Sequence, residues 1–386
     1  MRILIVRSFP DILNLNSYNV QEIGLASALT LKGNECDIVL FNGRNQDRIE
    51  KYIFKHEGKE YQFDIFWLKG YSFLKNGFMP SVKKIICDYD VVQVHEYDQI
   101  MSWKLYTTQE KPTVIYHGPY YDEYAKGYNL KCKLFDRFFL SRGNYEDVIA
   151  LTKSRLACAF LKEKGFQKVV PIGVGINPDN FGNFQQNGWN SVPEKQKKIL
   201  YVGKIEERRN VYFLIDVFRE LHKKDSNIIL TIIGNGEKKY KGRFLKDIKL
   251  ELEAKSIIYK ESVTQKELVK YYEESSLFLF ASNYEIFGMV LLEAMFFGVP
   301  VISSINGGST TIIENGYNGY IIDKCDKGKW VECIVKIIND NDKLKNLSIH
   351  ASETIRQQYT WSVMADKFLE AYRLAIEENK WKKNIR

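Results

Sequence analysis

Short apolar runs alternate with amphipathic helical stretches along this chain, and the alternation occurs twice. The first series predicts a helix at residues 20–32 and buried strands at residues 3–6, 36–41, 91–94, 113–116, 148–152 and 169–173. The second series predicts helices at residues 212–221, 245–254 and 290–297 and strands at residues 199–202, 228–233, 277–280 and 299–303. Such alternation is typical of parallel sheets with helices on both faces, so we expect two doubly wound α/β domains.

A polar stretch without periodicity, residues 177–198, separates the two series and contains two prolines and two glycines, as linkers do. The length of 386 residues also suits two domains at a prior of roughly 150 residues each. In doubly wound folds, ligands bind at the carboxyl ends of the strands. We therefore expect the site there, in a cleft between the two domains.

Composition excludes several classes of protein. Apolar residues make up 45% and charged residues 27% of the chain, which excludes a disordered protein. The net charge of +8 is thinly spread and no recognition motif accompanies it, so we expect no nucleic acid partner. The six cysteines form no C-x-x-C pair, which indicates neither a disulfide framework nor a zinc site. Because no apolar run approaches ~18 residues, we expect a cytoplasmic protein, free or at the inner face of the cell membrane.

Glu293 is an acidic residue in an otherwise apolar helical window. Its neighbours at three and four positions, Met289, Val290, Phe296 and Phe297, are all apolar, so its carboxylate does not lie on a solvent face. A buried carboxylate is costly unless it has strong partners. Two adjacent hydroxyls of a sugar are one such partner, and a neighbouring loop that the carboxylate caps is the alternative.

Glu285 lies eight positions earlier, in the loop that enters the same helix, beside Phe287 and Gly288. There its side chain can project into a site while free backbone N–H groups at the helix start face an anion. The alternative is that Glu285 is only an acid favoured by the helix dipole.

Two cations follow the first strand of the second series. Lys204 leaves the end of that strand and Arg209 precedes a helix, a placement that suits a diphosphate. Gly234 and Gly236 follow the next strand, but a lone G-x-G is more often a tight turn than a phosphate cradle.

Two of the five histidines in the chain, His95 and His117, stand at the ends of predicted strands in the first series. Gly118 allows the backbone next to His117 to approach a ligand closely. Both histidines are candidates for a site, and a structural imidazole with satisfied hydrogen bonds is the alternative for each.

A basic cluster covers residues 126–168, which hold ten basic and four acidic side chains. Within it, the segment 129–143 mixes aromatic and aliphatic side chains with lysines and arginines. Such a segment can lie on an anionic membrane and present the site to lipid-linked acceptors. The alternative is an ordinary helix that buries its aromatic side chains on the sheet.

Residues 285–301 carry a motif: Glu285-Ile286-Phe287-Gly288-x4-Glu293-Ala294-Met295-x2-Gly298-x-Pro300-Val301. The motif resembles the E-x7-E signature of the family 4 retaining glycosyltransferases, which have the GT-B fold of two Rossmann-like domains facing each other across a cleft. The resemblance extends over nearly the whole chain, through the segments at residues 31–36, 90–96, 151–181, 315–323 and 359–361.

The resemblance implies domains at residues 1–176 and 199–361, with a C-terminal helix at 362–386 that packs back onto the first. It implies that Lys204 and Arg209 bind the donor diphosphate and that Glu293 binds the nucleotide ribose. The other implied donor-site residues are Asn16, Ser17, Gly234, Ser262, Val263, Glu285, Phe287, Gly288, Met289 and Val290. His117 corresponds to a histidine beside the transferred sugar and, with Glu285, Lys204 and Arg209, forms the implied catalytic set.

The chain departs from the family pattern at five positions. Asn16-Ser17 replaces a Gly-Gly loop, where side chains would crowd the acceptor side or the diphosphate. Lys204 replaces the commoner arginine and offers a point charge instead of a fork. Glu261 replaces a glycine near the base, and Thr311 replaces a glutamate.

We therefore expect a retaining hexosyltransferase that uses a nucleotide-diphosphate sugar, needs no metal or other cofactor, and acts in bacterial surface polysaccharide or glycoconjugate synthesis. The acceptor is expected to be a glycan, a glycolipid or another hydroxyl compound, with an anionic membrane contacted through residues 126–168. Two Asp-x-Asp triplets, at residues 88–90 and 340–342, resemble ordinary strand-entry and loop acids rather than metal ligands. The alternatives are a GT-B sugar epimerase or phosphorylase and a non-catalytic GT-B partner subunit of a glycosyltransferase complex.

Overall fold

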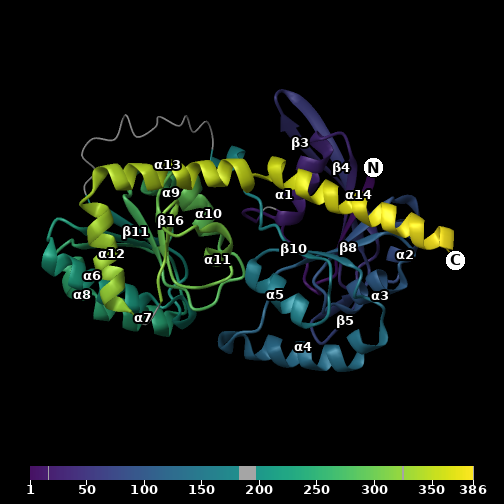
Figure 1. Ribbon diagram of the computed structural model, residues 1–386, viewed down its shortest axis with the longest axis horizontal. Coiled ribbons are helices and arrows are strands. Elements are labelled where there is room, and N and C mark those ends of the chain that lie inside the picture. Colours follow the sequence, from purple (N-terminus) through teal and green to yellow (C-terminus); the bar gives the residue numbers. More distant parts are fainter. Residues whose placement is uncertain (16, 182–196, 324–325, 386) are drawn as a thin grey trace. The chain divides into compact units, whose positions relative to one another are not determined.

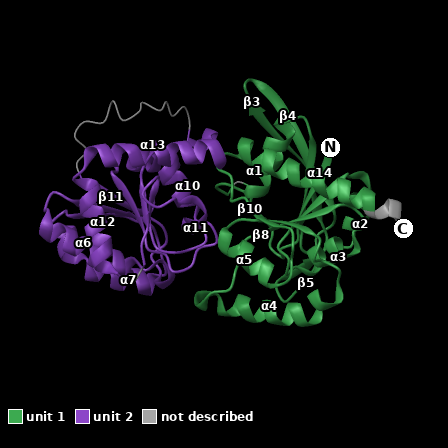
Figure 2. Ribbon diagram, viewed as in Figure 1, with its two compact units in different colours: residues 1–177, 360–386 green, residues 178–359 purple. Residues whose placement is uncertain are grey.

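The computed structural model of the chain describes residues 1–15, 17–181, 197–323 and 326–385 and divides into two compact units. Unit 1 comprises residues 1–177 and 360–386, and unit 2 comprises residues 178–359 (Figure 2). The described residues therefore join the C-terminal end of the chain to the N-terminal unit. Most of the predicted linker lies outside the described residues.

Unit 1 contains an eight-stranded sheet (Figure 1). Its strand order is β10 (Val169–Pro171), β9 (Ile149–Thr152), β8 (Thr113–His117), β7 (Val91–His95), β1 (Arg2–Arg7), β2 (Glu35–Phe41), β4 (Lys59–Leu68) and β3 (Arg48–His56). All neighbours pair in parallel except β3 and β4, which form an antiparallel hairpin. The central strands β7 and β8 are wholly buried, and β1 is buried at residues 3–6, as in sheets that helices cover on both sides.

Helices cover both faces of this sheet. The helices α1 (Gln21–Leu31) and α14 (Trp361–Ile385) pack against each other and against the sheet, while α3 (Ile100–Thr108) contacts β7 and β8 and α5 (Arg155–Glu163) contacts β9 and β10. The helix α4 (Lys126–Phe138) and a small hairpin of β5 (Tyr71–Phe73) and β6 (Asn76–Phe78) complete this unit together with the short α2 (Val82–Ile85). The helix α4 and the β5–β6 hairpin form the walls of a groove described below.

The C-terminal helix α14 is held to unit 1 by close packing and by polar contacts. The Trp361 ring lies so close to Gly24 and Gly175 that a Cβ at either glycine would be within 2.3 Å of a ring atom. The Tyr372 hydroxyl donates a hydrogen bond of 2.5 Å to Gln93 Oε1. Since the first half of the helix is fixed in this way, that half of α14 is part of the unit's core.

Unit 2 contains a six-stranded sheet in which every pair of neighbours is parallel. Its strand order is β13 (Ile257–Lys260), β12 (Ile229–Ile233), β11 (Lys198–Val202), β14 (Leu277–Phe280), β15 (Val301–Ser303) and β16 (Gly319–Ile321). Its main helices are α6 (Val211–Lys224), α7 (Lys238–Asp247), α8 (Lys249–Glu253), α9 (Gln265–Glu274), α10 (Met289–Phe296), α11 (Ser309–Ile312), α12 (Lys327–Ile338) and α13 (Asn341–Gln358). The helix predicted at residues 245–254 is instead the end of α7 followed by α8, which meet at the buried Ile248.

The strand order in unit 2 reverses direction between β11 and β14. The connections that leave the carboxyl ends of β11 and β14 run in opposite directions along the sheet, which leaves room there for a ligand. In unit 1 the corresponding reversal lies between β1 and β7.

Candidate functional site

The loops that follow β11 and β14 bring the sequence-predicted cations and acids together at the reversal point of unit 2. The Asn283 N–H donates to Arg208 O over 2.9 Å, and Arg208 Nη1 donates to Tyr284 O over 2.5 Å. These bonds join the two loops, so the residues that the loops carry are positioned before any ligand binds.

Arg209 and Glu285 form an ion pair within this loop pair. Arg209 Nη1 contacts Glu285 Oε2, and both side chains are largely buried, with about 15% and 14% of their surface exposed. Arg209 also lies over the Phe280 ring, 5.4 Å from its centroid. Partial desolvation strengthens such a pair and fixes the guanidinium in one place.

Lys204 is the exposed cation of the site. Its backbone carbonyl accepts a hydrogen bond of 2.8 Å from the Tyr201 hydroxyl, which fixes the backbone at the end of β11. No ion pair of the Lys204 ammonium occurs within the described part of the chain. Lys204 is therefore available for an anion, whereas Arg209 has a carboxylate beside it.

Glu293 lies in α10 with only 2% of its surface exposed, as the sequence predicted. The Tyr272 hydroxyl donates a hydrogen bond of 2.8 Å to Glu293 Oε2. Tyr272 comes from α9, 21 residues earlier, and its ring stacks on Phe297 at 5.4 Å. The sequence analysis missed this partner because nothing in the local pattern connects the two helices.

The residues that lead into α10 lie close to the backbone of a second segment, which contains Gly308. Gly288 has a φ of +82°, which favours glycine, and it directly precedes Met289 and Val290 in the first turn. Across from it, a Cβ at Gly308 would lie 1.6 Å from the Phe287 carbonyl oxygen. The two segments therefore pack backbone to backbone, and a Cβ at Gly288 would lie 3.1 Å from Glu285 Cγ.

The remaining predicted donor-site residues of unit 2 are Gly234, Ser262 and Val263, which follow strands β12 and β13. A Cβ at Gly234 would lie 1.8 Å from Gly203 O, so strand packing requires this glycine whether or not a phosphate binds. Ser262 and Val263 follow β13 and directly precede Thr264, which caps α9. Their role as contacts of the base stays a prediction.

In unit 1, His117 lies at the end of β8 and its side chain is completely buried. His117 Nδ1 is 2.5 Å from Glu96 Oε2, which also accepts a hydrogen bond of 3.0 Å from the Gly118 N–H. Glu96 has a left-handed φ of +61°, an unfavourable conformation for this residue type. Burial would raise the pKa of Glu96, but the adjacent His117, with Lys153 and the Gly118 amide, lowers it to about 2.

His95 lies at the end of β7 and is a second buried imidazole. It contacts Gln93 at 3.2 Å and Glu22 at 3.4 Å. Burial lowers the pKa of His95 to about 4 against the opposing effect of the Glu22 charge. Such a histidine is a neutral structural group at neutral pH, which agrees with the structural alternative for this residue.

Of the Asn16-Ser17 pair, Asn16 lies outside the described residues. Ser17 is exposed, and its N–H donates a hydrogen bond of 3.0 Å to Asn14 O.

Glu96, Asp98 and His117 are the three groups in the described structure whose potential metal-ligating atoms lie within 4.8 Å of one another. Lys131 Nζ is 2.7 Å from Asp98 Oδ2, so a cation already neutralises part of that cluster.

Comparisons with known proteins place the chain beside glycosyltransferases. Residues 184–354 match the family model "Glycosyl transferases group 1". A probable sucrose-phosphate synthase from Thermosipho melanesiensis is 28% identical over 54% of this chain and 47% of its own length. The capsular polysaccharide biosynthesis glycosyltransferase CapM from Staphylococcus aureus is 25% identical over 61% of this chain and 63% of its own length.

Among solved structures, sucrose-phosphate synthase from Thermosynechococcus elongatus has a TM-score of 0.71 at 16% identity. The comparison covers 98% of this chain and 100% of that one. The chain thus has the GT-B fold that the sequence predicted. It spans about half the length of the two curated relatives named above. No helix among the described residues is both long and apolar enough to span a membrane.

Proposed function

We propose that this chain is a retaining glycosyltransferase that moves a hexose-type sugar from a nucleotide-diphosphate sugar to a hydroxyl acceptor. The observation that carries the proposal is the juxtaposition, at the reversal point of unit 2, of the exposed Lys204 with the Arg209–Glu285 pair. A sheet edge of this kind binds nucleotides in other doubly wound folds. The match of residues 184–354 to a glycosyl transferase model supports the same assignment.

In this proposal the cations bind the donor diphosphate. Lys204 offers a free point charge, and Arg209 offers a guanidinium whose remaining donors can serve phosphate oxygens. The buried Glu293 accepts hydrogen bonds from the nucleotide ribose through the carboxylate oxygens that Tyr272 positions. Glu285 and the first-turn amides of α10 serve the hydroxyls of the donor sugar.

We infer that transfer occurs on one face of the sugar without a covalent enzyme intermediate. The bond between the anomeric carbon and the departing phosphate oxygen breaks, and the acceptor oxygen bonds to that carbon on the same face. The acceptor proton passes to the departing phosphate oxygen. The negative charge that develops on the diphosphate is stabilised by Lys204 and Arg209, which makes a metal ion unnecessary.

We also infer a role in surface polysaccharide or glycoconjugate synthesis at an anionic membrane. The relationship to CapM supports the first part, and the basic segment of unit 1 supports the second. Unit 1, which contains His117, is then the acceptor-side unit.

Donor hydrolysis across a panel of nucleotide sugars tests the enzymatic assignment. We expect one donor to be hydrolysed slowly without acceptor and Arg209→Ala to lose at least ~100-fold of that turnover. Arg219→Ala is the matched control, since Arg219 lies in α6 and pairs with Glu251 at 2.6 Å. Binding of a donor without hydrolysis or transfer would instead indicate a non-catalytic partner subunit, and release of free epimerised sugar would indicate an epimerase.

A further inference from the structure

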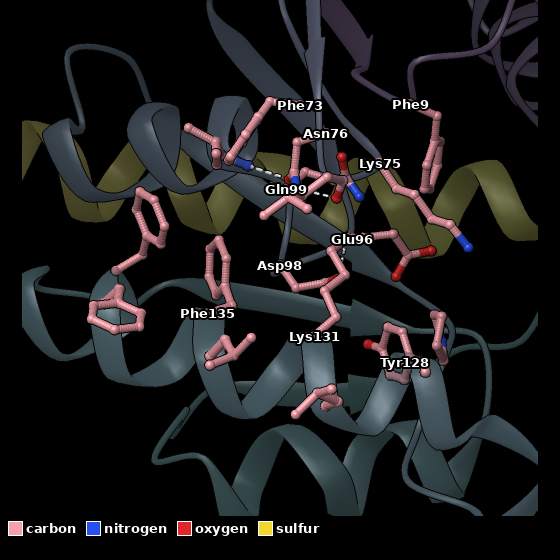
Figure 3. Close-up of a pocket in the computed structure, with 18 residues that line it drawn as sticks. Phe9, Phe73, Lys75, Asn76, Glu96, Asp98, Gln99, Tyr128, Lys131 and Phe135 are labelled. Atoms are coloured by element: carbon pink, nitrogen blue, oxygen red, sulfur yellow. Dashed lines mark hydrogen bonds and ion pairs between the residues drawn. The ribbon is translucent and has the colours of Figure 1, made fainter.

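A groove of about 810 Å³ opens in unit 1 between α4 and the β5–β6 hairpin (Figure 3). Figure 3 shows Phe135, Lys131 and Tyr128 on the α4 side and Phe73, Asn76 and Lys75 on the other. The volume lies in the range of ligand sites for small molecules, and most of the lining side chains are apolar. The proposed donor site does not involve this groove, since all of its lining residues belong to unit 1.

The α4 wall presents an exposed apolar stripe. Leu130, Leu134 and Phe138 follow one another at four-residue spacing, so they share one side of the helix, and about 61%, 49% and 49% of their surfaces are exposed. The buried residues of the helix are different ones, Cys132 and Phe135, which lie beside the stripe, and Phe135 also lines the groove. The stripe is therefore not needed for the core of unit 1.

The opposite wall adds more exposed apolar surface. Phe73 and Leu74, at the tip of the β5–β6 hairpin, have about 69% and 70% of their surfaces exposed and also line the groove. Contiguous apolar surface of this kind marks a binding site, whereas scattered exposed apolar residues carry no such meaning.

The floor of the groove is polar and incompletely satisfied. Asp98 and Gln99 line it with only 1% and 2% of their surfaces exposed. Asp98 Oδ1 and Gln99 Oε1 accept no hydrogen bond from any described residue, while Lys131 lies 2.7 Å from Asp98 Oδ2. Buried acceptors without donors are costly, so the floor is suited to a ligand that brings hydroxyl groups.

Cations line the mouth and the outer side of the groove. Lys75 lines the groove and is exposed. Lys126, Lys133 and Arg137 are spaced so that they form a basic stripe on α4 beside the apolar one. None of these four forms an ion pair with another described residue, so they offer positive charge to a phosphate or to an anionic membrane surface.

We propose that this groove binds the hydrocarbon chain of an amphiphilic acceptor, a lipid whose hydroxyl-bearing head group reaches the polar floor. The chain contacts the apolar stripe and the hairpin tip. The hydroxyls of the head group donate to Asp98 and Gln99, close to Glu96 and its partner His117. The assignment of this lipid as the acceptor rests on the glycosyltransferase function proposed above, whereas the binding of an amphiphile in the groove does not depend on that function.

The probe is 11-(dansylamino)undecanoic acid, whose fluorescence rises in apolar sites, displaced by alkyl maltosides below their micelle concentrations. Each buried methylene tightens binding roughly fourfold, so decyl maltoside should compete at least ~10-fold better than octyl maltoside, and maltose should not compete. Leu134→Asp should weaken probe binding at least ~10-fold. Leu374→Asp is the matched control because Leu374 is equally exposed, at about 47%, on α14 of the same unit.

Absence of saturable probe binding, displacement by maltose as effective as by decyl maltoside, or an equal loss in Leu374→Asp would each overturn the proposal. Phe73→Ser provides an independent second variant on the opposite wall, and the folding of every variant is checked by its thermal unfolding.

A transfer assay separates this inference from the proposed function. With a productive donor, KM for alkyl glycoside acceptors should fall with chain length in the wild type and become independent of chain length in Leu134→Asp. Donor hydrolysis with no effect of acceptor chain length on KM would contradict the binding of the acceptor in the groove, while the proposed glycosyltransferase activity would stand. Probe binding without any donor hydrolysis would contradict the proposed enzymatic activity, while the binding of an amphiphile in the groove would stand.

Discussion

The two cations of the donor site differ in what they contact, and this difference has consequences for single substitutions. Arg209 is paired with Glu285 and packed over Phe280, whereas Lys204 is exposed and forms no ion pair within the part of the chain that the structure describes. The sequence predicted the same role for both. The contacts show that Arg209 also stabilises the two loops that follow β11 and β14.

Lys204→Ala should leave the thermal stability of the protein unchanged and reduce turnover at least ~100-fold, because the lost charge acts only on the diphosphate. Arg209→Ala should reduce turnover as much and should also lower the free energy of unfolding by about 1 kcal/mol, since Glu285 loses its main partner. Turnover and thermal denaturation of the two variants measure this difference. Equal melting temperatures for the two variants would contradict the structural role of Arg209.

Acid should destabilise unit 1 in two steps. The pKa of His95 is lowered from 6.5 to about 4, so its contribution is complete above pH 6.5 and is lost as the pH falls toward 4. The pKa of Glu96 is lowered from 4.5 to about 2, so its contribution is lost between pH 4.5 and 2. Urea unfolding should show a loss of about 3 kcal/mol between pH 6.5 and 4 that His95→Asn removes.

His350→Asn, a substitution in unit 2, is the control for this measurement. If the wild type and His95→Asn lost stability in parallel over this range, His95 would not be the group responsible.

At the scale of elements, the surface of α4 has three parts, which are buried, groove-lining and basic. Cys132 and Phe135 pack into unit 1, Phe135 and the stripe of Leu130, Leu134 and Phe138 line the groove, and Lys126, Lys133 and Arg137 form the basic stripe. The sequence analysis gave an ordinary buried helix and a membrane-facing segment as alternatives. The structure shows that the helix buries Phe135 and leaves about half of Phe138 exposed, although both side chains line the groove.

The triple variant of Lys126, Lys133 and Arg137, each to glutamate, should bind vesicles containing phosphatidylglycerol at least ~10-fold more weakly at low salt. Attraction to anionic lipid contributes about 1 kcal/mol for each basic residue near the surface. Co-sedimentation measures the bound fraction. The matched control is the same charge reversal at Lys238, Lys239 and Lys246 on α7 of unit 2. Equal effects of both triples would show that net charge alone governs binding.

The β3–β4 hairpin is an element that the sequence analysis missed. Its strands alternate between exposed and more buried residues, and Glu57 and Gly58 form a two-residue turn with φ values of +48° and +77°. Period-two alternation around such a turn is a recognisable hairpin signal. Continuous apolar runs, which are typical of strands buried on both faces, do not predict this half-exposed hairpin.

At the scale of the whole molecule, each unit has its own reversal point and its own charged groups. Unit 2 carries the proposed donor residues, and unit 1 carries the groove and the Glu96–His117 pair. This division predicts that donor binding and amphiphile binding can be measured separately in the intact chain.

A nucleoside diphosphate at 100 times its Kd should stabilise the folded protein by about 2.7 kcal/mol, seen as a higher melting temperature in differential scanning fluorimetry. Arg209→Ala should reduce this shift, while Leu134→Asp should not. A shift that persists in both Arg209→Ala and Lys204→Ala would place the nucleotide elsewhere.

EDTA should leave turnover with a productive donor unchanged, because two cations already neutralise the departing diphosphate in the proposed mechanism. The measurement is the initial rate before and after chelation, followed by addition of Mg²⁺ or Mn²⁺. Loss of activity on chelation and recovery with Mn²⁺ would contradict metal-free transfer and would direct attention to Glu96, Asp98 and His117.

The sequence by itself determined the fold class, most strands of both sheets and the positions of Lys204, Arg209, Glu285 and Glu293 in the chain. These features follow from local patterns: apolar runs, helical spacing and motif residues at strand ends. The tertiary structure decided which of these residues touch. The Arg209–Glu285 pair, the Tyr272–Glu293 hydrogen bond and the groove all join segments distant in sequence, whose proximity depends on how strands and helices pack.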